Sequence, residues 1–557
     1  MSEEKPIAEV IPLIRLPRSL GVFDYLVPQD RAKELAAGTL VRVPFRNRQV
    51  PAVVISLQSK STVSKELRPI EEICLDRFVP SGHLAALLAI SEELAVSPAS
   101  FLFSLVPKIP AKMNPLRRAE TVRPRTIKFP PSFIEKIQIA TSALQKHTDI
   151  FFQIDDRFFL FTLLARLALA AHEQQRHLRI LLPTQKQVIA LAQALQLHGL
   201  PVKRYLPSAG SKERFDLWQQ CANDNLPVLV GARSALFFPF PPQSRLCLVD
   251  EHREDWKQAD KNPRYDVRSL LPLIQKYEKI QIFRTGPVPR LETFYRMSQK
   301  QCESRDLRLH APPSVSLIHT GKSTLPPNAS FLSWPLWEAL EKTPRTVIFV
   351  VKKGKGSVLL CGDCRYLFRC LNCDTPLASH RAFLRCPADK EKIPIPLLCP
   401  HCQSSRLRSY GGGTEQFEDD LRAHFPQRVI YRLDRENTRP DTSWQILVGT
   451  SALLQFFSEQ FVPVPSLNLV VVGEADSLLH RPDFRGQERL ASILSELVAL
   501  ARQTHSPMIL QTSFPELAVW SIASSHEQTF LETELEERKK FHYPPFGKLI
   551  KCIIQSP

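Results

Sequence analysis

The first part of the chain alternates apolar and polar residues in short runs separated by turn signals. The segments "AEVIPLIRLPRSLGVFDYLVP" and "GTLVRVPFRNRQVPAVVISLQ" place apolar side chains at roughly every second position. This period is typical of strands that bury one face. A helical pattern, "SGHLAALLAISEELAV", follows, and the next stretch is basic and rich in proline. We therefore expect a small β-rich domain over residues 1–112 and a linker over residues 113–131.

Beyond the linker, helical stretches alternate with short, wholly apolar runs. The runs "LRILLP", "LPVLVG", "RLCLVD" and "KIQIF" form a first set, and "RTVIFVV", "RVIYRLD", "WQILVGT", "NLVVVGEAD" and "PMILQT" form a second. Apolar strands separated by helices predict βα units around parallel sheets. We expect two α/β lobes, over residues 132–310 and 311–505, with residues 506–557 starting a C-terminal domain.

Composition favours a polyanionic partner. The chain has 557 residues, enough for several domains, and 73 Lys and Arg against 56 Asp and Glu give a net charge of +17. Such an excess is typical of proteins that bind nucleic acid, although it also serves solubility alone. Glycine is scarce: 18 residues are about 3% of the chain, against roughly 7% in average proteins. Loops that bind phosphate through backbone N–H groups are built from glycine, so few can exist here.

The chain shows no sign of export or membrane insertion. Its start, "MSEEKPIAEV", is acidic and polar, unlike a signal peptide. The longest apolar run, "FFLFTLLARLALAA", contains Arg166 and is too short for a bilayer, so we interpret it as a buried helix. Seven of the twelve cysteines lie between Cys361 and Cys402, which indicates a metal site in a reducing compartment. We expect a cytoplasmic protein with no membrane partner.

The clustered cysteines predict a zinc-binding module over residues 359–404. A CxxC pair presents two thiolates from one tight turn, and zinc prefers four tetrahedral ligands. Cys361, Cys364, Cys399 and Cys402 make one complete set. Cys370, Cys373 and Cys386 need a fourth ligand, which is either Asp389 or His380. We expect one or two Zn²⁺ ions in a structural role, because four protein ligands leave no position for a reacting water.

Several longer motifs resemble one family. They are "LPRSLGVFDYLVP", "GARSALFFPF", "LVDEHREDWKQADKNPRYDVRSL", the cysteine module with "GGGTEQFEDDL", "ILVGTSALLQ", "DFRGQERL" and "ERKKFHYPPFGKLI". In this order they resemble primosomal protein N′ (PriA), the family of bacterial replication-restart helicases. The resemblance implies two RecA-like helicase lobes, with the zinc module inserted in the second. It also implies an N-terminal domain that binds the 3′ end of DNA at a fork.

The resemblance also implies DNA-binding residues. Phe23 and Asp24 match the family's 3′-end pocket, and Arg68 falls where the family has a basic residue. From the residues alone, Phe23 fits equally well as a core aromatic at a strand end. Arg42, Arg46 and Arg48 near a predicted hairpin either follow a phosphate backbone or line a solvated loop. The partners implied are forked or 3′-ended DNA, with other primosome or single-strand-binding proteins.

The parts that should handle ATP are degenerate. A P-loop is expected near "DIFFQIDDRFFLFTLLARLA", which has neither glycine nor lysine. The segment "HTGKSTLPPN" resembles a P-loop only at Gly321, Lys322 and Ser323, because the pattern requires glycine where Ser316 stands.

Remnants of the other ATPase elements remain. Asp250 and Glu251 are what is left of an acid box, or else solvated charges at a strand end. The arginine-finger helix keeps one arginine, Arg502, in a shifted register or without that role.

The sequence therefore predicts a DNA-binding protein of replication restart that does not hydrolyse ATP. Two alternatives stay open. One is an active ATP-dependent 3′–5′ DNA helicase with unusual loops, with ATP and Mg²⁺ as cofactors. The other is a protein-interaction scaffold that has lost DNA binding.

Overall fold

The structure is a computed structural model, and the chain divides into two compact units. The first comprises residues 1–152, 159–286 and 303–305, and the second comprises residues 153–158, 287–302 and 306–557. The described residues are 6–550 except 18–20, 29–30, 32, 62–65, 111–129, 242, 321–322, 324–331, 352–356, 365, 374, 380–382, 387–388, 411–413, 435–436, 438–439, 462–463, 475 and 480–482. His380, most of the linker and the Gly321–Lys322 pair lie outside them.

The first unit begins with an antiparallel sheet whose strand order is β2-β1-β4-β3-β5. The strands are β1 (Ile7–Pro12), β2 (Phe23–Leu26), β3 (Leu40–Phe45), β4 (Arg48–Gln58) and β5 (Glu72–Leu75), followed by helices α1 (Ser81–Glu93) and α2 (Pro98–Leu105). Apolar residues of alternate strand positions form two cores, so the predicted period-2 pattern is confirmed. Gly38 (φ 92°) makes the turn before β3, where an added Cβ would collide with the Val79 carbonyl.

The rest of this unit is built on a sheet with the order β14-β6-β13-β10-β7-β9-β8, and the central pairs are parallel. Its strands are β6 (Asp149–Gln153), β7 (Leu178–Leu181), β8 (Val202–Tyr205), β9 (Val228–Gly231), β10 (Arg245–Leu248), β13 (Gln281–Gly286) and β14 (Glu303–Asp306), with a small hairpin of β11 (Lys257–Gln258) and β12 (Tyr265–Asp266). The helices are α3 (Pro131–Lys146), α4 (Arg157–Glu173), α5 (Gln185–Leu197), α6 (Ser211–Ala222) and α7 (Val267–Glu278). Short 3-10 helices lie at Arg233–Phe237 and Glu254–Trp256.

The second unit has a parallel sheet with the order β15-β25-β24-β16-β23-β22. The strands are β15 (Val315–His319), β16 (Thr346–Val350), β22 (Ile430–Leu433), β23 (Ile446–Gly449), β24 (Leu469–Glu474) and β25 (Met508–Thr512). The helices are α8 (Leu291–Ser298), α9 (Trp334–Lys342), α10 (Thr414–His424), α11 (Ser451–Ser458), α12 (Asp476–Leu479), α13 (Gly486–Thr504) and α14 (Glu527–Lys540), with a 3-10 helix at Ala518–Ile522. Strand β15 was not predicted.

Strand β16 shows why these runs are apolar without alternation. Val347 and Phe349 join one core cluster, while Ile348 and Val350 join another on the opposite face of the sheet. A strand covered by helices on both faces buries every side chain, so the pattern is continuous. Strand β25 completes this sheet beyond residue 505, so the expected limit of the second lobe falls too early and moves past Thr512.

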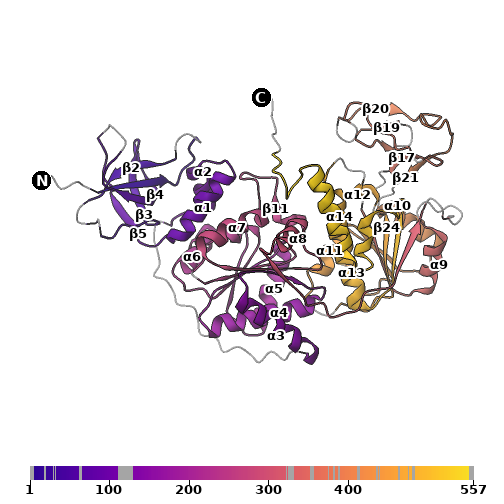
Figure 1. The fold of residues 1–557 in the computed structure, drawn as a ribbon, viewed down its shortest axis with the longest axis horizontal. Helices are drawn as coiled ribbons and strands as arrows, with labels where there is room; N and C mark the ends of the chain where they lie inside the picture. The colour runs from indigo at the N-terminus through magenta and orange to yellow at the C-terminus, as the bar shows by residue number, and fades with distance from the viewer. Residues whose placement is uncertain are drawn as a thin grey trace. The chain divides into compact units, whose positions relative to one another are not determined.

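The cysteine module is a separate antiparallel sheet inserted between β16 and α10, with the order β20-β19-β18-β17-β21 (Figure 1). Its strands are β17 (Ser357–Cys361), β18 (Ala378–Ser379), β19 (Phe383–Arg385), β20 (Lys392–Pro394) and β21 (Leu407–Tyr410). The expected fold class is thereby confirmed: an N-terminal β domain, two parallel α/β sheets and a metal-type insertion in the second.

The predicted buried helix is α4, whose residues are mostly enclosed by the first unit. In the part of the chain that the structure describes, no single helix has the length and apolar character to cross a bilayer. The helices α1 and α2 meet that test only as a pair bent by 120°.

Candidate functional site

A cavity of about 490 Å³ in the N-terminal β domain contains all three residues predicted to bind DNA. Phe23 and Asp24 begin β2, and Arg68 lies in the segment between β4 and β5. The lining residues are Glu9, Val22, Phe23, Asp24, Tyr25, Pro44, Phe45, Arg46, Glu66, Leu67 and Arg68. An isolated bridge between Leu26 and Pro69 brings the segment of Arg68 beside the end of β2, and the ring of Phe23 in β2 contacts that of Phe45 at the end of β3.

Each of the three predicted side chains is held in place by a neighbour. The rings of Phe23 and Phe45 meet edge to face, with centroids 5.2 Å apart. Ser61 Oγ donates a hydrogen bond of 2.5 Å to Asp24 Oδ2. Arg68 Nη1 donates to the Arg46 carbonyl oxygen at 3.2 Å. The cavity therefore offers an aromatic ring, a carboxylate and a guanidinium in fixed positions.

Phe23 was interpreted either as part of a pocket for the DNA end or as a core aromatic residue, and its position agrees with each interpretation in part. The ring is half-buried and packs against the core of the β domain, yet it also lines the cavity. Tyr25 closes the wall beside it by donating to the Pro44 carbonyl oxygen at 3.0 Å. Burial raises the pKa of Tyr25 above its usual value, and the charge of Arg68 partly offsets this rise. Tyr25 and Ser61 were missed, because neither is marked by spacing in the sequence.

Arg42 and Arg46, which lie near the hairpin of β3 and β4, have different surroundings. Arg46 lines the cavity with its backbone in the left-handed region (φ 53°). Arg42 instead pairs with Glu72 on the surface, at 3.1 Å. Only Arg46 therefore adds to the cavity among these residues.

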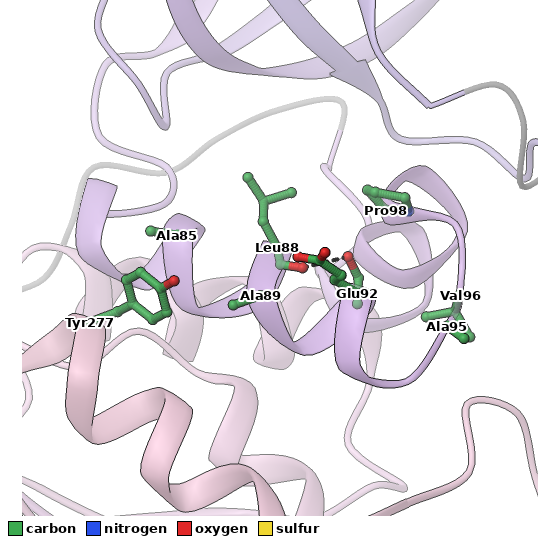
Figure 2. Close-up of a pocket in the computed structure, with 9 residues that line it drawn as sticks. Ala85, Leu88, Ala89, Glu92, Ala95, Val96, Pro98 and Tyr277 are labelled. Carbon is green, nitrogen blue, oxygen red and sulfur yellow. Dashed lines mark hydrogen bonds between the residues drawn. The ribbon is translucent and has the colours of Figure 1, made fainter. Parts of the chain in front are cut away.

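A second cavity, of about 590 Å³, runs along α1 between Tyr277 and Pro98 (Figure 2). Its lining is mostly apolar, with Ala85, Leu88 and Ala89 on one face of the helix. Glu92 is the one acidic residue among those that line it. None of the residues predicted to be functional lines this cavity, so we assign it no role.

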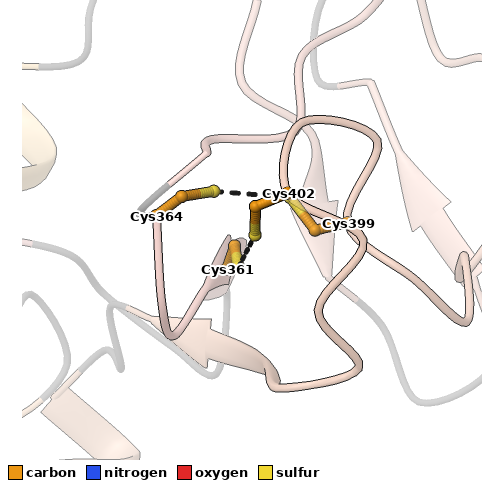
Figure 3. A group of neighbouring side chains, drawn as sticks. All are labelled: Cys361, Cys364, Cys399 and Cys402. Carbon is orange, nitrogen blue, oxygen red and sulfur yellow. Dashed lines mark hydrogen bonds between the residues drawn. The ribbon is translucent and has the colours of Figure 1, made fainter.

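The cysteines form the first of the two expected clusters. Cys361 Sγ lies 3.5 Å from Cys402 Sγ, and Cys364 Sγ lies 3.5 Å from Cys399 Sγ (Figure 3). The four sulfur atoms lie within 4.8 Å of one another. Tetrahedral zinc with Zn–S bonds of ~2.3 Å sets sulfur atoms about 3.8 Å apart, so this set fits the ion. Backbone N–H groups, that of Cys364 foremost, lower the pKa of Cys361 to about 6, which favours the thiolate that binds metal.

The second cluster contains Cys370, Cys373, Cys386 and Asp389, also within 4.8 Å of one another. Asp389 Oδ2 lies 3.0 Å from Cys370 Sγ, and Cys373 Sγ lies 3.4 Å from Cys386 Sγ. The hydrogen bond from Cys370 lowers the pKa of Asp389 to about 2, so the carboxylate is charged at neutral pH. Asp389 thus occupies the fourth position, while its rival His380 lies outside the described residues.

The acid-box residues are buried rather than solvated. Asp250 and Glu251 are 2% and 1% exposed, which contradicts the interpretation as solvated charges. Gln187 Nε2 donates to Asp250 Oδ2 at 3.4 Å, and Arg284 Nε lies 3.4 Å from Glu251 Oε2. Arg284 also bonds to Asp149, in β6. These carboxylates already take part in a hydrogen-bonded and ion-paired network.

The segment after β6, where a P-loop would lie, is short and acidic. Three residues, Ile154 to Asp156, separate β6 from α4. They group with the second unit, where Asp155 Oδ2 lies 3.7 Å from Arg502 Nη1. Asp155 Oδ1 accepts the Leu309 N–H at 3.4 Å. A glycine-rich loop that encloses phosphate has more residues and small ones, so this connection differs from such a loop in length and composition.

Neighbouring residues reinforce this arrangement. His310 Nε2 lies 2.9 Å from Asp156 Oδ2, and that hydrogen bond raises the pKa of His310. Burial raises the pKa of Asp155 despite the nearby Arg502 charge. Arg502 Nη2 donates to Ser525 Oγ at 2.6 Å. The arginine considered for a finger thus contacts protein groups, an arrangement that no local sequence signal revealed.

Comparisons with known proteins agree with this anatomy. Residues 12–107 match the family described as the 3′DNA-binding domain (3′BD) of PriA. The replication restart protein PriA of Bacillus subtilis is 28% identical over 397 residues, covering 65% of this chain and 49% of that protein. That of Rickettsia conorii is 24% identical over 596 residues, covering 99% of this chain and 86% of that protein. The chain spans about half the length of the first curated relatives it matches.

Among solved structures, the DUF1998 helicase MrfA bound to DNA matches with 12% identity and a TM-score of 0.37, over 74% of this chain and 55% of that one. The sheets and the metal-type insertion define an α/β protein with an N-terminal β domain that contains a cavity. The chain is similar to the PriA replication restart proteins, and its residues 12–107 match the 3′DNA-binding domain of that family.

Proposed function

We propose that the protein binds the 3′ end of a DNA strand at a fork and acts in replication restart without hydrolysing ATP. The observation that carries the proposal is the cavity in which Phe23, Asp24 and Arg68 meet. The match to the 3′DNA-binding domain covers every residue that lines the cavity except Glu9, and the net charge of +17 supports a nucleic-acid partner.

The three side chains suit the end of a DNA strand. An aromatic ring can stack on a base, which is worth ~1–3 kcal/mol per base. A carboxylate accepts a hydrogen bond from a terminal hydroxyl, and a guanidinium binds phosphate with two parallel bonds. We assign these roles to Phe23, Asp24 and Arg68 in that order, with Arg46 near the phosphate.

The absence of ATP hydrolysis is proposed from what fills the nucleotide region. Phosphoryl transfer depends almost wholly on positioned charges: a phosphate-binding loop, a metal-binding acid and an arginine. Asp155 would repel a phosphate, and Asp250 and Glu251 are enclosed in the network of Gln187 and Arg284. Each of the three required elements is thus replaced or occupied.

We propose that residues 1–112 form the DNA-end-binding domain and 113–131 its linker. The two lobes would then serve as a scaffold for other primosome or single-strand-binding proteins, and zinc would stabilise the module over residues 359–404. The four-ligand clusters support the structural role, since a complete ligand set leaves the metal no position for substrate.

Fork binding is tested by fluorescence anisotropy with the full chain and forks that either present or lack a 3′ end at the junction. We expect preference for the 3′-ended fork and an affinity that falls steeply with salt. Phe23→Ala should remove most of the preference, while Lys203→Ala, an exposed residue on β8, should not. Equal binding to both forks, or binding insensitive to salt, would favour an interaction scaffold instead.

ATP hydrolysis is tested separately, with zinc-loaded protein and forked DNA. We expect no turnover above background. A rate on the order of 1 per second or faster would overturn this part of the proposal and favour an active helicase.

A further inference from the structure

The two metal clusters differ in one ligand, and the carboxylate in the second is oriented by its own turn. Asp389 Oδ1 accepts the backbone N–H of Glu391 at 3.0 Å. Asp389 Oδ2 is thereby directed at the sulfur of Cys370, 3.0 Å away. A metal ion in this cluster would accordingly meet three sulfur atoms and one oxygen atom.

This difference has a chemical consequence. Zinc is a borderline-soft ion, and thiolate ligands bind it more strongly than a hard carboxylate oxygen does. The first cluster supplies four sulfur atoms, whereas Asp389 is an exposed residue whose oxygen atoms also attract water. The second cluster should hold the ion less firmly.

A second carboxylate lies beside the weaker cluster. Glu391 Oε2 is 3.6 Å from Cys370 Sγ, and Asn372 Nδ2 donates to it at 3.1 Å. A carboxylate held next to a ligand sulfur, as Glu391 is, can bind the zinc ion while one of the original ligands dissociates.

The positions of the clusters allow one ion to leave while the other stays. The first cluster joins the end of β17 to the turn before β21 and so closes the base of the module. The second joins the turn before β18 to the turn between β19 and β20. Leu359, Phe368, Leu377 and Leu384 form a small core around Cys370 and Cys386, which helps to keep these strands together without the second ion.

We propose that the protein holds two zinc ions unequally: the cluster of Cys361, Cys364, Cys399 and Cys402 retains its ion, and the cluster completed by Asp389 exchanges its ion with the surroundings. Asp389 sets the difference, and Glu391 assists the exchange. The inference depends on zinc binding by both clusters and is independent of the proposed DNA binding.

The test follows zinc release from the full-length, zinc-loaded protein into an excess of a chromogenic chelator. We expect two phases of equal amplitude, one ion each, with rates that differ at least about tenfold, since even an outer-shell change alters zinc affinity by about 10–100-fold. Asp389→Cys should convert the fast phase into a slow one, and Glu391→Gln should slow the fast phase while leaving the slow one unchanged.

A mirror variant provides the matched control. Cys364→Asp gives the first cluster three sulfur ligands and one oxygen ligand. Its zinc ion should then also be released in the fast phase. Cobalt substitution reports the ligands directly, because the sulfur-to-cobalt absorption bands should gain intensity in Asp389→Cys and lose it in Cys364→Asp. If Asp389→Cys does not fold, Asp389→Asn provides the second test. It should no longer bind the zinc ion that is released in the fast phase and should still bind the one released in the slow phase.

Three results would overturn the inference. They are a single release phase in the natural protein, two phases that Asp389→Cys leaves unchanged, and one ion per chain both in the natural protein and in Asp389→Cys. One ion in the natural protein that becomes two in Asp389→Cys would support it, because the added thiolate would have restored the weak site.

Discussion

Asp155 Oδ2 lies 3.7 Å from Arg502 Nη1, and both side chains are almost completely buried. In this protein the acidic residue after β6 therefore faces the arginine of α13. The same guanidinium donates to the His310 carbonyl oxygen at 2.8 Å and to Ser525 Oγ. Arg502 thus connects three segments of the second unit, and we interpret its role as structural.

Replacing Arg502 tests this interpretation. Arg502→Ala removes the positive charge beside the buried Asp155 carboxylate and the donor to the His310 carbonyl and the Ser525 hydroxyl, and should lower the free energy of unfolding by about 1–3 kcal/mol. Chemical denaturation followed by tryptophan fluorescence measures it. The control is Arg42→Ala, which removes an exposed ion pair with Glu72 and should cost no more than about 0.5 kcal/mol. Equal stability of Arg502→Ala and the natural protein would contradict a structural role.

We expect the stability of the folded protein to depend on pH through the buried carboxyl group of Glu534. Burial raises its pKa to about 7, against 4.5 in the unfolded chain, although Arg538 lies 3.0 Å away. The folded state therefore holds a proton that the unfolded state has released between pH 4.5 and 7, and stability falls as pH rises through this range.

Thermal unfolding of Glu534→Gln from pH 5 to 8 provides the measurement. The variant should be more stable than the natural protein at pH 8, and this advantage should disappear toward pH 5, where Glu534 is protonated. Glu536→Gln, an exposed residue of the same helix, should show no such trend. An advantage that is constant across the whole range would show that the proton of Glu534 is not responsible.

If the cavity receives a DNA end, as we propose, we expect Arg68 to contact a phosphate group of the DNA. Arg68→Ala should weaken binding to every 3′-ended fork by a similar factor and reduce the salt slope by about one ion. Lys203→Ala removes the same charge on β8, away from the cavity lining. Anisotropy titrations at several salt concentrations separate the two, and an unchanged slope in Arg68→Ala would argue against the contact.

We expect the hydroxyl group of Ser61 to position the carboxylate of Asp24. Its hydrogen bond of 2.5 Å holds Asp24 Oδ2 and leaves the carboxylate in one orientation. Ser61→Ala should reduce the preference for a 3′-hydroxyl end over a 3′-deoxy end by up to about fivefold, the value of one hydrogen bond of ~1 kcal/mol. Ser443→Ala removes another bond from a serine hydroxyl to an aspartate, of 3.1 Å to Asp441, and serves as the control because neither residue lines the cavity. If both variants keep the full preference, Ser61 does not orient Asp24 for binding.

Local patterns predicted the parts of the fold that local chemistry decides. The run "TVIFV" in β16 is apolar because both faces of the sheet are covered. The CxxC spacing brought the cysteines into two clusters, since each pair is formed by one turn. Asp389, which lies three residues after Cys386, was one of the two residues considered for the fourth position, with His380 as the other.

The contacts that the sequence did not reveal join residues far apart in the chain. Nothing near Asp155 marks Arg502 as its partner, and nothing near Asp24 marks Ser61. Strand β15 was missed because "VSLIH" is short and, at the edge of its sheet, half exposed. Burial of Asp250 and Glu251 depends on Gln187 and Arg284, which come from different βα units.

The cysteine module begins and ends on two paired strands. Val358 in β17 lies directly opposite Tyr410 in β21. Paired residues of antiparallel strands have Cα atoms about 4.5–5.5 Å apart, so one short peptide can join the two positions. The segment between them can therefore be excised, expressed by itself or exchanged for a relative's, and the register of β16 against β23 and β24 would not change. In evolution the same geometry lets this insertion lengthen, shrink or disappear without a change to the lobe that bears it.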